Sequence, residues 1–184
     1  LMSTARGDVL RYDFETERTD VLVAKQGQLK GLCAAEDGAV LVVRENTKSV
    51  LAITASGEIS TVVEGLNAPS DVLQWQGKCY VSDSGDGCVL EISPAGEVST
   101  VLDGLLDPRG IAAIGNTLYV LDRAGHSIWA IELGSESKPE QIATHLPIGA
   151  ICPLDFAGGL CVDGQGGLLV AADGEGSVLR LSRV

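Results

Sequence analysis

The chain repeats itself at a spacing of 39 residues. Residues 58–66 read EISTVVEGL, and residues 97–105 read EVSTVLDGL. The same offset relates Asp83 to Asp122. A fixed internal period constrains the fold strongly, because each copy must be one small unit that buries its apolar face only against its neighbours. The sequence therefore predicts a repeat architecture.

Each unit contains four short apolar runs with β-branched or alternating character, separated by Gly, Asp, Asn or Ser. In the third unit these runs cover residues 71–73, 79–82, 88–92 and 98–102. Strand signals of this kind recur along the chain, whereas helical spacing is absent from every useful window. Four strands in about 40 residues are typical of a propeller blade. We expect an all-β propeller of four-stranded antiparallel blades with repeats of 39–41 residues.

The repeat boundaries predict a single propeller segment over residues 1–184. Its units are a partial blade at 1–26, full blades at 27–65, 66–104 and 105–145, and a partial blade at 146–184. The first unit shows two strands, near 8–13 and 20–24, and the last shows three, giving 17 strands in all. We expect a partial propeller that is a fragment or is completed by a partner. A small ring of four or five blades with a spare strand is the alternative.

Composition narrows the classes of partner. Aromatic residues make up only 4% of the chain, so aliphatic side chains must fill the core. The net charge of −12 repels phosphate backbones and disfavours nucleic-acid binding. We expect no transmembrane segment, because no apolar run approaches the roughly 20 residues that a spanning helix needs. The chain opens on Leu1 and Met2, as a processed or truncated product would. The sequence does not assign the protein to a cellular compartment.

The five cysteines lack CxxC spacing, and an odd number does not complete a disulfide framework. Free, buried thiols are expected. A disulfide between Cys79 and Cys88 across one hairpin is the alternative, and it requires Cα atoms within about 7 Å.

Several segments resemble known propeller repeats. Residues 106–112 (LDPRGIA), 116–122 (NTLYVLD) and 127–131 (SIWAI) resemble an NHL repeat. Residues 158–171, followed by 176–181, resemble the related gluconolactonase and senescence-marker propellers. The resemblance implies a propeller of six blades. It does not imply one function, because such propellers serve as enzymes, sensors and scaffolds.

The resemblance also implies where a metal ion would lie. Gluconolactonase-like hydrolases hold one divalent cation at the ring centre, with the Asp of a Pro-Asp-Gly motif at the start of an innermost strand as a ligand. The matching positions here are Lys30, Ser70, Arg109 and Gly158. Two positive charges near the axis oppose a cation site. We therefore predict no catalytic or cofactor-binding residues, although a divalent cation stays an alternative.

Four carboxylates are weak candidates for that cation: Asp71, Asp83, Asp86 and Asp155. Asp71 lies one residue after the motif position, and Asp155 lies in an inserted segment. Asp83 and Asp86 belong to the loop DSGDG, which we interpret as a turn between two strands. Asp83 is predicted to fix that turn as a strand-end carboxylate.

Comparison with the other units supports the turn. Asp83 corresponds to Asp122, and in the outer units to Glu45 and Ala172, so the carboxylate is not kept in every copy. A phosphate-binding loop is disfavoured because no helix follows. The two histidines, His126 and His145, are too few for a zinc site of NHL-type lyases.

Partner contacts are predicted at two places. Trp75 falls in an expected turn and should be exposed, whereas Trp129 should pack between blades. The last unit carries an inserted apolar segment, about 145–157, whose large side chains would be costly to leave in water. Its predicted contact residues are Ile148, Ile151, Leu154 and Phe156.

These observations favour a non-catalytic NHL-like propeller that binds a protein partner or serves as an accessory subunit of an assembly. The alternatives are a gluconolactonase-like, metal-dependent hydrolase of lactones or esters with its ligands outside this segment, and a ligand-sensing domain.

Overall fold

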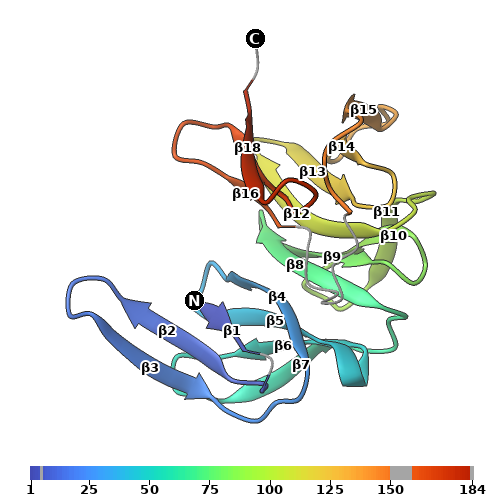
Figure 1. Ribbon diagram of the computed structural model, residues 1–184. Coiled ribbons are helices and arrows are strands. Elements are labelled where there is room, and N and C mark those ends of the chain that lie inside the picture. The colour runs from blue at the N-terminus through green and yellow to red at the C-terminus, as the bar shows by residue number, and fades with distance from the viewer. Residues whose placement is uncertain (5, 150–158, 183–184) are drawn as a thin grey trace.

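The computed structural model of the protein describes residues 1–4, 6–149 and 159–182. These residues form five antiparallel β-sheets that follow one another around an open arc (Figure 1). The strands of the first two sheets are β1 (Met2–Ser3), β2 (Val9–Asp13) and β3 (Arg18–Val23), then β4 (Leu29–Ala34), β5 (Val40–Arg44), β6 (Ser49–Ile53) and β7 (Ile59–Val63). The third sheet holds β8 (Pro69–Trp75), β9 (Lys78–Asp83), β10 (Cys88–Ile92) and β11 (Val98–Leu102). The last two hold β12 (Pro108–Ile114), β13 (Thr117–Asp122), β14 (Ser127–Glu132) and β15 (Glu140–Ala143), then β16 (Leu160–Val162), β17 (Leu168–Ala172) and β18 (Ser177–Leu181). The predicted all-β propeller of antiparallel blades is confirmed.

The strand number of the first sheet differs from the prediction. The second, third and fourth sheets have four strands each, and the first and last have three. The sequence predicted two strands in the first unit, but β1 pairs with β2 through Met2 and Leu10. The described residues therefore contain 18 strands. A two-residue strand is too short to show the alternation by which strands are recognised in a sequence.

The sheets are arranged like the blades of a propeller. The first strands of the last four sheets pack on one another in the order β4, β8, β12, β16 and lie on the inner side of the arc (Figure 1). The first and last sheets lie at its two ends, so the alternative of a small closed ring is not found. Register shifts recur between Val50 and Leu51, between Val89 and Leu90, and between Ile128 and Trp129, one repeat apart. Such bulges increase the twist of each sheet.

The core lies between consecutive sheets. One cluster joins the first two sheets around Val9, Val42 and Leu51, and the next joins the second and third around Val50 and Val81. Two further clusters fill the spaces between the third and fourth sheets and between the fourth and fifth. Aliphatic side chains dominate all four, as the composition predicted. Trp129 packs against the cluster between the third and fourth sheets, which confirms its predicted position.

Strand pairing excludes the hairpin disulfide. Cys79 pairs with Ile92 and Cys88 pairs with Asp83, so the two cysteines lie at opposite ends of the β9–β10 hairpin. The alternative of a cross-hairpin bond is wrong because the hairpin register separates the two cysteines along the strands. Cys33, Cys79, Cys88 and Cys161 are free thiols, and Cys152 lies outside the described residues.

Helical structure in the described part of the chain is limited to the short 3-10 helix η1 (Glu45–Thr47). Among the described residues, no helix has both the length and the apolar character needed to cross a membrane.

Candidate functional site

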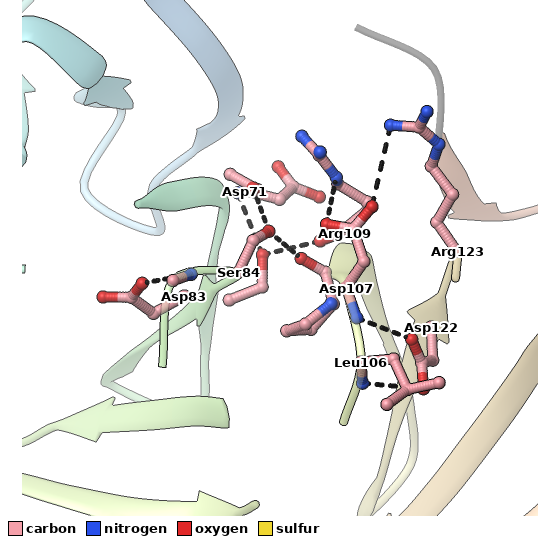
Figure 2. Close-up of polar contacts among 12 residues, drawn as sticks. Asp71, Asp83, Ser84, Leu106, Asp107, Arg109, Asp122 and Arg123 are labelled. Carbon is pink, nitrogen blue, oxygen red and sulfur yellow. Dashed lines mark hydrogen bonds and ion pairs between the residues drawn. The ribbon is translucent and has the colours of Figure 1, made fainter. Parts of the chain in front are cut away.

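Polar side chains gather where the inner strands begin, and Figure 2 shows the part contributed by the third and fourth sheets. We call these residues the axial cluster: Lys30, Ser70, Asp71, Asp107 and Arg109. Lys30 lies on β4, Ser70 and Asp71 lie on β8, and Arg109 lies on β12 directly after the Asp107-Pro108 step. The repeat brings them together because equivalent positions of successive blades face the same axis.

The cations of the axial cluster are paired with carboxylates. Lys30 Nζ lies 2.8 Å from Glu45 Oε1, and only 8% of the Lys30 side chain is exposed. Arg109 Nε lies 2.8 Å from Asp107 Oδ1, while Arg123 Nη1 lies 3.6 Å from Asp107 Oδ2. The Asp107 carboxylate is therefore shared between two guanidinium groups (Figure 2). Such a carboxylate is a poor metal ligand, because its charge is already compensated.

Serines connect the third sheet to the fourth. Ser70 Oγ lies 2.7 Å from Ser84 Oγ, and Ser84 Oγ donates to the Pro108 carbonyl oxygen at 2.7 Å. Ser82 Oγ donates to the Arg109 carbonyl oxygen at 2.6 Å. These bonds satisfy polar groups at a buried junction, where unpaired groups would be costly. Ser70 occupies one motif position of the cation site, and its hydroxyl is hydrogen-bonded to Ser84, one of the two serines that join the blades.

Asp71 bridges three sheets from β8. Its Oδ1 accepts the Val72 N–H at 2.9 Å, and its Oδ2 accepts the Ile111 N–H of β12 at 3.0 Å. On the other side the carboxylate lies against Gly31 of β4, where an added Cβ would overlap it. Loss of hydration raises the pKa of the Asp71 carboxyl to about 7, although its two N–H donors act in the opposite direction. The Asp71 carboxyl group therefore keeps its proton to a higher pH than an ordinary aspartate does.

The aspartates of the DSGDG loop and of its next copy have a structural role. Asp83 is fully buried, and its carboxylate accepts the backbone N–H groups of Asn67 and Ala68, both at 2.7 Å, and of Gly85 at 3.1 Å. One repeat later, Asp122 accepts the two equivalent N–H groups, of Leu106 and Asp107, and a third N–H from Gly125 in its own turn. Each carboxylate therefore fixes both its own turn and the segment that leads into the blade (Figure 2). This agrees with the strand-end role predicted for Asp83 and extends it.

Strand pairing changes one assignment in the second sheet. Asp83 pairs opposite Pro69, and Arg44 occupies the same place opposite Leu29. The counterpart of Asp83 is therefore Arg44, and the predicted Glu45 is wrong by one residue. The error arises because η1 follows β5 directly and hides the strand end in the sequence.

Of the remaining metal candidates, the described ones lie outside the axial cluster. Asp86 is exposed and accepts a hydrogen bond from Asn67 Nδ2 at 2.8 Å. Asp155 lies outside the described residues. His126 Nδ1 lies 3.3 Å from the Leu146 carbonyl oxygen, whereas His145 Nδ1 lies 3.0 Å from Thr144 Oγ1. Within the described ranges, no group of three or more His, Cys, Asp or Glu side chains could hold a metal ion.

The predicted partner residues have different surroundings. Trp75 was expected to be exposed in a turn, but it is the last residue of β8 and is half-buried. It lies against the next sheet, where its Nε1 donates to the Gly115 carbonyl oxygen at 2.9 Å. Ile148 is only 2% exposed and packs in the cluster between the fourth and fifth sheets, so the start of the inserted segment faces inward. Ile151, Leu154 and Phe156 lie outside the described residues, and their role stays a prediction.

Sequence reasoning missed an apolar face on the first sheet that no other described sheet covers. We call it the first-sheet face: Met2, Leu10, Tyr12 and Val21. Met2 and Val21 pair with Leu10, which places the three side chains on one side of the sheet. Tyr12, Met2 and Val21 are 36%, 43% and 59% exposed. The signal was present, because Leu10 and Tyr12 occupy the repeat positions of Leu51 and Ile53, which are buried in the second sheet.

An aromatic pair extends this face. Phe14, in the turn after β2, is 88% exposed. Its ring packs edge-on against Tyr12, with ring centres 5.0 Å apart. Exposed aromatic side chains are common at protein interfaces.

A groove lies between the fourth and fifth sheets. It has a volume of about 690 Å³, with an apolar floor that includes Tyr119 and Leu168 and a polar edge that includes Glu132 and Lys138. A groove of this size and mixed lining is typical of small-molecule sites.

No protein-family model and no curated protein matches the sequence. Solved structures do match the fold. A gluconolactonase from Xanthomonas campestris is 20% identical with a TM-score of 0.76, and the match covers 96% of this chain and 69% of that one. A chain of a nidogen/laminin complex is 18% identical with a TM-score of 0.74, covering 91% and 67%. Virginiamycin B lyase from Staphylococcus aureus is 15% identical with a TM-score of 0.69, covering 100% and 65%.

The chain thus spans about two thirds of the length of these structures. The three proteins differ in activity while sharing one architecture, and at such identities the likeness concerns the fold alone. Together with the five sheets, it establishes that this chain has a β-propeller fold.

Proposed function

We propose that the protein is a non-catalytic, NHL-like propeller that binds a protein partner or serves as an accessory subunit of an assembly. The composition of the axial cluster carries this proposal. At the positions where a gluconolactonase-like site has its Asp ligand, the described residues are Lys30, Ser70 and Arg109. Two of these are cations paired with carboxylates, and the third is hydrogen-bonded to Ser84, which itself donates to the Pro108 carbonyl oxygen of the next sheet. A divalent cation placed there would face positive charge.

The uncovered first-sheet face supports the protein-binding part of the proposal. Its side chains are large and uncharged, and Phe14 projects beside them. Contiguous apolar surface of this kind marks interaction sites in soluble proteins. The predicted contacts at Ile151, Leu154 and Phe156 belong to the same proposal.

A metal-dependent hydrolase of lactones or esters is the second candidate, favoured by the likeness to gluconolactonase folds. Its ligands would have to come mainly from outside the described residues, with Asp71 or Asp107 as the nearest carboxylates of the cluster. One experiment distinguishes this hydrolase from the proposed non-catalytic propeller.

Calcium and zinc are titrated into the protein by calorimetry, and hydrolysis of a panel of sugar lactones is followed with and without each metal. We expect neither stoichiometric binding nor metal-dependent turnover. The proposal fails if a 1:1 metal complex hydrolyses lactones and both properties disappear in Asp71→Ala and Asp107→Ala. Asp86→Ala is the matched control, because Asp86 is an exposed carboxylate outside the axial cluster.

A ligand-sensing domain is the third candidate, and the groove between the fourth and fifth sheets favours it. Saturable binding of small molecules, lost when Tyr119 in the groove floor is replaced by Ala, would support this alternative. The same binding retained in the variant would place the ligand elsewhere.

A further inference from the structure

A second groove lies between the second and third sheets, and we call it the alanine groove. Its volume is about 330 Å³. The second sheet and its β4–β5 turn contribute Ala35, Ala39, Leu41 and Ala52, and the third sheet contributes Cys79 and Ile92. Both sheets have four strands and lie inside the arc, so a full blade forms each wall. The groove is larger than the engineered cavity of about 150 Å³ that holds benzene.

Small side chains on the second sheet leave this groove open. One repeat later, Lys78 takes the position of Ala39. Glu91 likewise takes the position of Ala52. Lys78 Nζ lies 2.8 Å from Glu91 Oε1, and the Tyr80 hydroxyl donates to Glu91 Oε2 at 3.0 Å. The groove is therefore a property of the alanine residues in one blade and not a requirement of the fold.

Hydrogen bonds between the two sheets hold the groove in shape. The Glu36 N–H donates to Gln74 Oε1 at 2.6 Å, and the Gly77 N–H donates to Glu36 Oε1 at 3.4 Å. Glu36 belongs to the β4–β5 turn, whereas Gln74 and Gly77 belong to β8 and the turn after it. Because Gln74 and Gly77 also line the groove, this wall is formed before a ligand binds. A preformed site loses less free energy on binding than one that has to be ordered first.

The edge of the groove is negatively charged. Asp37 is exposed, and it is the charged residue among the described residues that line the groove. Its Oδ1 accepts the Ala39 N–H at 3.0 Å, which places the carboxylate beside the groove floor. Glu36 precedes it in the same turn, and the described lining contains no Lys, Arg or His. The net charge of −12 adds a field that attracts cations. The groove is therefore complementary to a molecule with an apolar body and a positive charge at one end.

We propose that the alanine groove binds a small organic amine, with its apolar body against the aliphatic floor and its ammonium group beside Asp37. The inference goes beyond the proposed function and does not depend on it. Burial of the apolar body supplies most of the affinity. Because Asp37 is exposed to water, the charge pair contributes selectivity for a cation more than it contributes affinity.

Three probes with the same naphthalene ring separate the effect of charge from that of apolar contact. 1-Naphthylmethylamine is positively charged at pH 7, 1-naphthalenemethanol is neutral, and 1-naphthoate is negatively charged. Each probe is titrated into the protein while methyl NMR spectra are recorded. We expect a Kd on the order of 1 mM for the amine, as is usual for a ligand of this size. The alcohol should bind about fivefold more weakly, and the naphthoate more weakly still. Nuclear Overhauser effects should join the ring of the amine to the methyl groups of Ala39, Ala52 and Ile92.

Two substitutions in the groove test the two parts of the proposal. Asp37→Asn keeps an oxygen that can accept the Ala39 N–H, and it should weaken binding of the amine about fivefold while leaving the alcohol unchanged. Asp103→Asn is the matched control, because Asp103 is an exposed aspartate that follows β11 and lies outside the described lining. Ala52→Leu places a larger side chain in the groove and should abolish saturable binding of amine and alcohol alike. Since Ala52 is partly exposed, circular dichroism should show an unchanged fold.

The proposal is overturned if the amine does not bind saturably at its highest soluble concentration, or if the naphthoate binds as tightly as the amine. Equal effects of Asp103→Asn and Asp37→Asn overturn it as well. Overhauser effects from the amine to other methyl groups do the same, and this measurement needs no variant, so it decides the matter even where Ala52→Leu does not fold. Tyr119→Ala, in the groove between the fourth and fifth sheets, should leave the affinity for the amine unchanged, whereas a loss would place the amine there instead. None of these results concerns metal-dependent turnover or a protein partner, so the proposed function can stand where this inference fails.

Discussion

Asp83 offers the sharpest test of how the propeller is held together. Its buried carboxylate accepts three backbone N–H groups, two from the segment before β8 and one from its own turn. Asp83→Asn keeps the size of the side chain but replaces one acceptor oxygen by an NH₂ group. If the amide oxygen takes the Oδ1 position, the NH₂ group faces the Asn67 N–H, and a buried donor is left without an acceptor.

The size of the effect follows from these contacts. A hydrogen bond to a charged group contributes about 1.5–3 kcal/mol, and a buried unsatisfied donor costs about 1–3 kcal/mol. We expect Asp83→Asn to lower the free energy of unfolding by about 2 kcal/mol and Asp83→Ala, which removes all three acceptor contacts, by about 4 kcal/mol. With a urea dependence of about 2 kcal/mol per molar, the first change shifts the midpoint by roughly 1 M.

Urea unfolding at pH 7, followed by the fluorescence of Trp75 and Trp129, measures this shift. Asp122→Asn should give a similar loss, because Asp122 also accepts three backbone N–H groups, two from the segment before β12 and one from its own turn. Asp86→Asn is the matched control; this exposed residue of the same loop should change stability by no more than about 0.5 kcal/mol. If Asp83→Asn and Asp86→Asn unfold at the same urea concentration, the carboxylate does not hold the blade as described.

Two other predictions concern the same inner region. The pKa of Asp71 is raised to about 7 from an ordinary 3.8, so the folded state binds its proton more tightly than the unfolded state. The stability that this carboxyl group contributes is therefore full below about pH 4 and is lost as pH rises toward and through 7. The melting temperature of the unaltered protein should decline from pH 5 to 8 for this reason, and that of Asp71→Asn should lack this decline. The same pH profile in both proteins would contradict the assigned pKa. Gly87 has a φ of +63°, and an added Cβ would overlap the Leu105 carbonyl oxygen. Gly87→Ala should therefore lower the free energy of unfolding by about 1–3 kcal/mol more than Gly77→Ala does. Gly77 is the control because its φ is +75° but an added Cβ would meet nothing within 4 Å. Equal shifts in melting temperature would show that the overlap at Gly87 is relieved without loss of stability.

The repeat let the sequence predict most of the fold. The offset from Asp83 to Asp122 and the four apolar runs per unit determined the blade and its antiparallel strands, because local alternation and turn residues depend on neighbours in the chain. The same reasoning predicted that Trp129 packs between blades. It missed β1, whose two residues carry no period, and it placed the counterpart of Asp83 one residue late in the second sheet, where η1 hides the strand end.

The site depended on contacts between units, which the repeat does not encode. The sequence placed Lys30, Ser70 and Arg109 at one motif position. Only the tertiary structure shows that Lys30 forms an ion pair with Glu45 and that Asp107 forms ion pairs with two arginines. Asp71, one residue from that position, gained its raised pKa because neighbouring sheets remove its carboxyl group from water.

What the sequence determined by itself is the repeating unit, because that unit is built from local pattern and turn chemistry. What the tertiary structure decided is which sides of the units are covered. Leu10 and Leu51 are the same residue at the same repeat position, yet Leu51 is buried and Leu10 belongs to the first-sheet face. Their surroundings differ only because a preceding sheet packs on one of them, and packing between sheets is a property of the assembled arc.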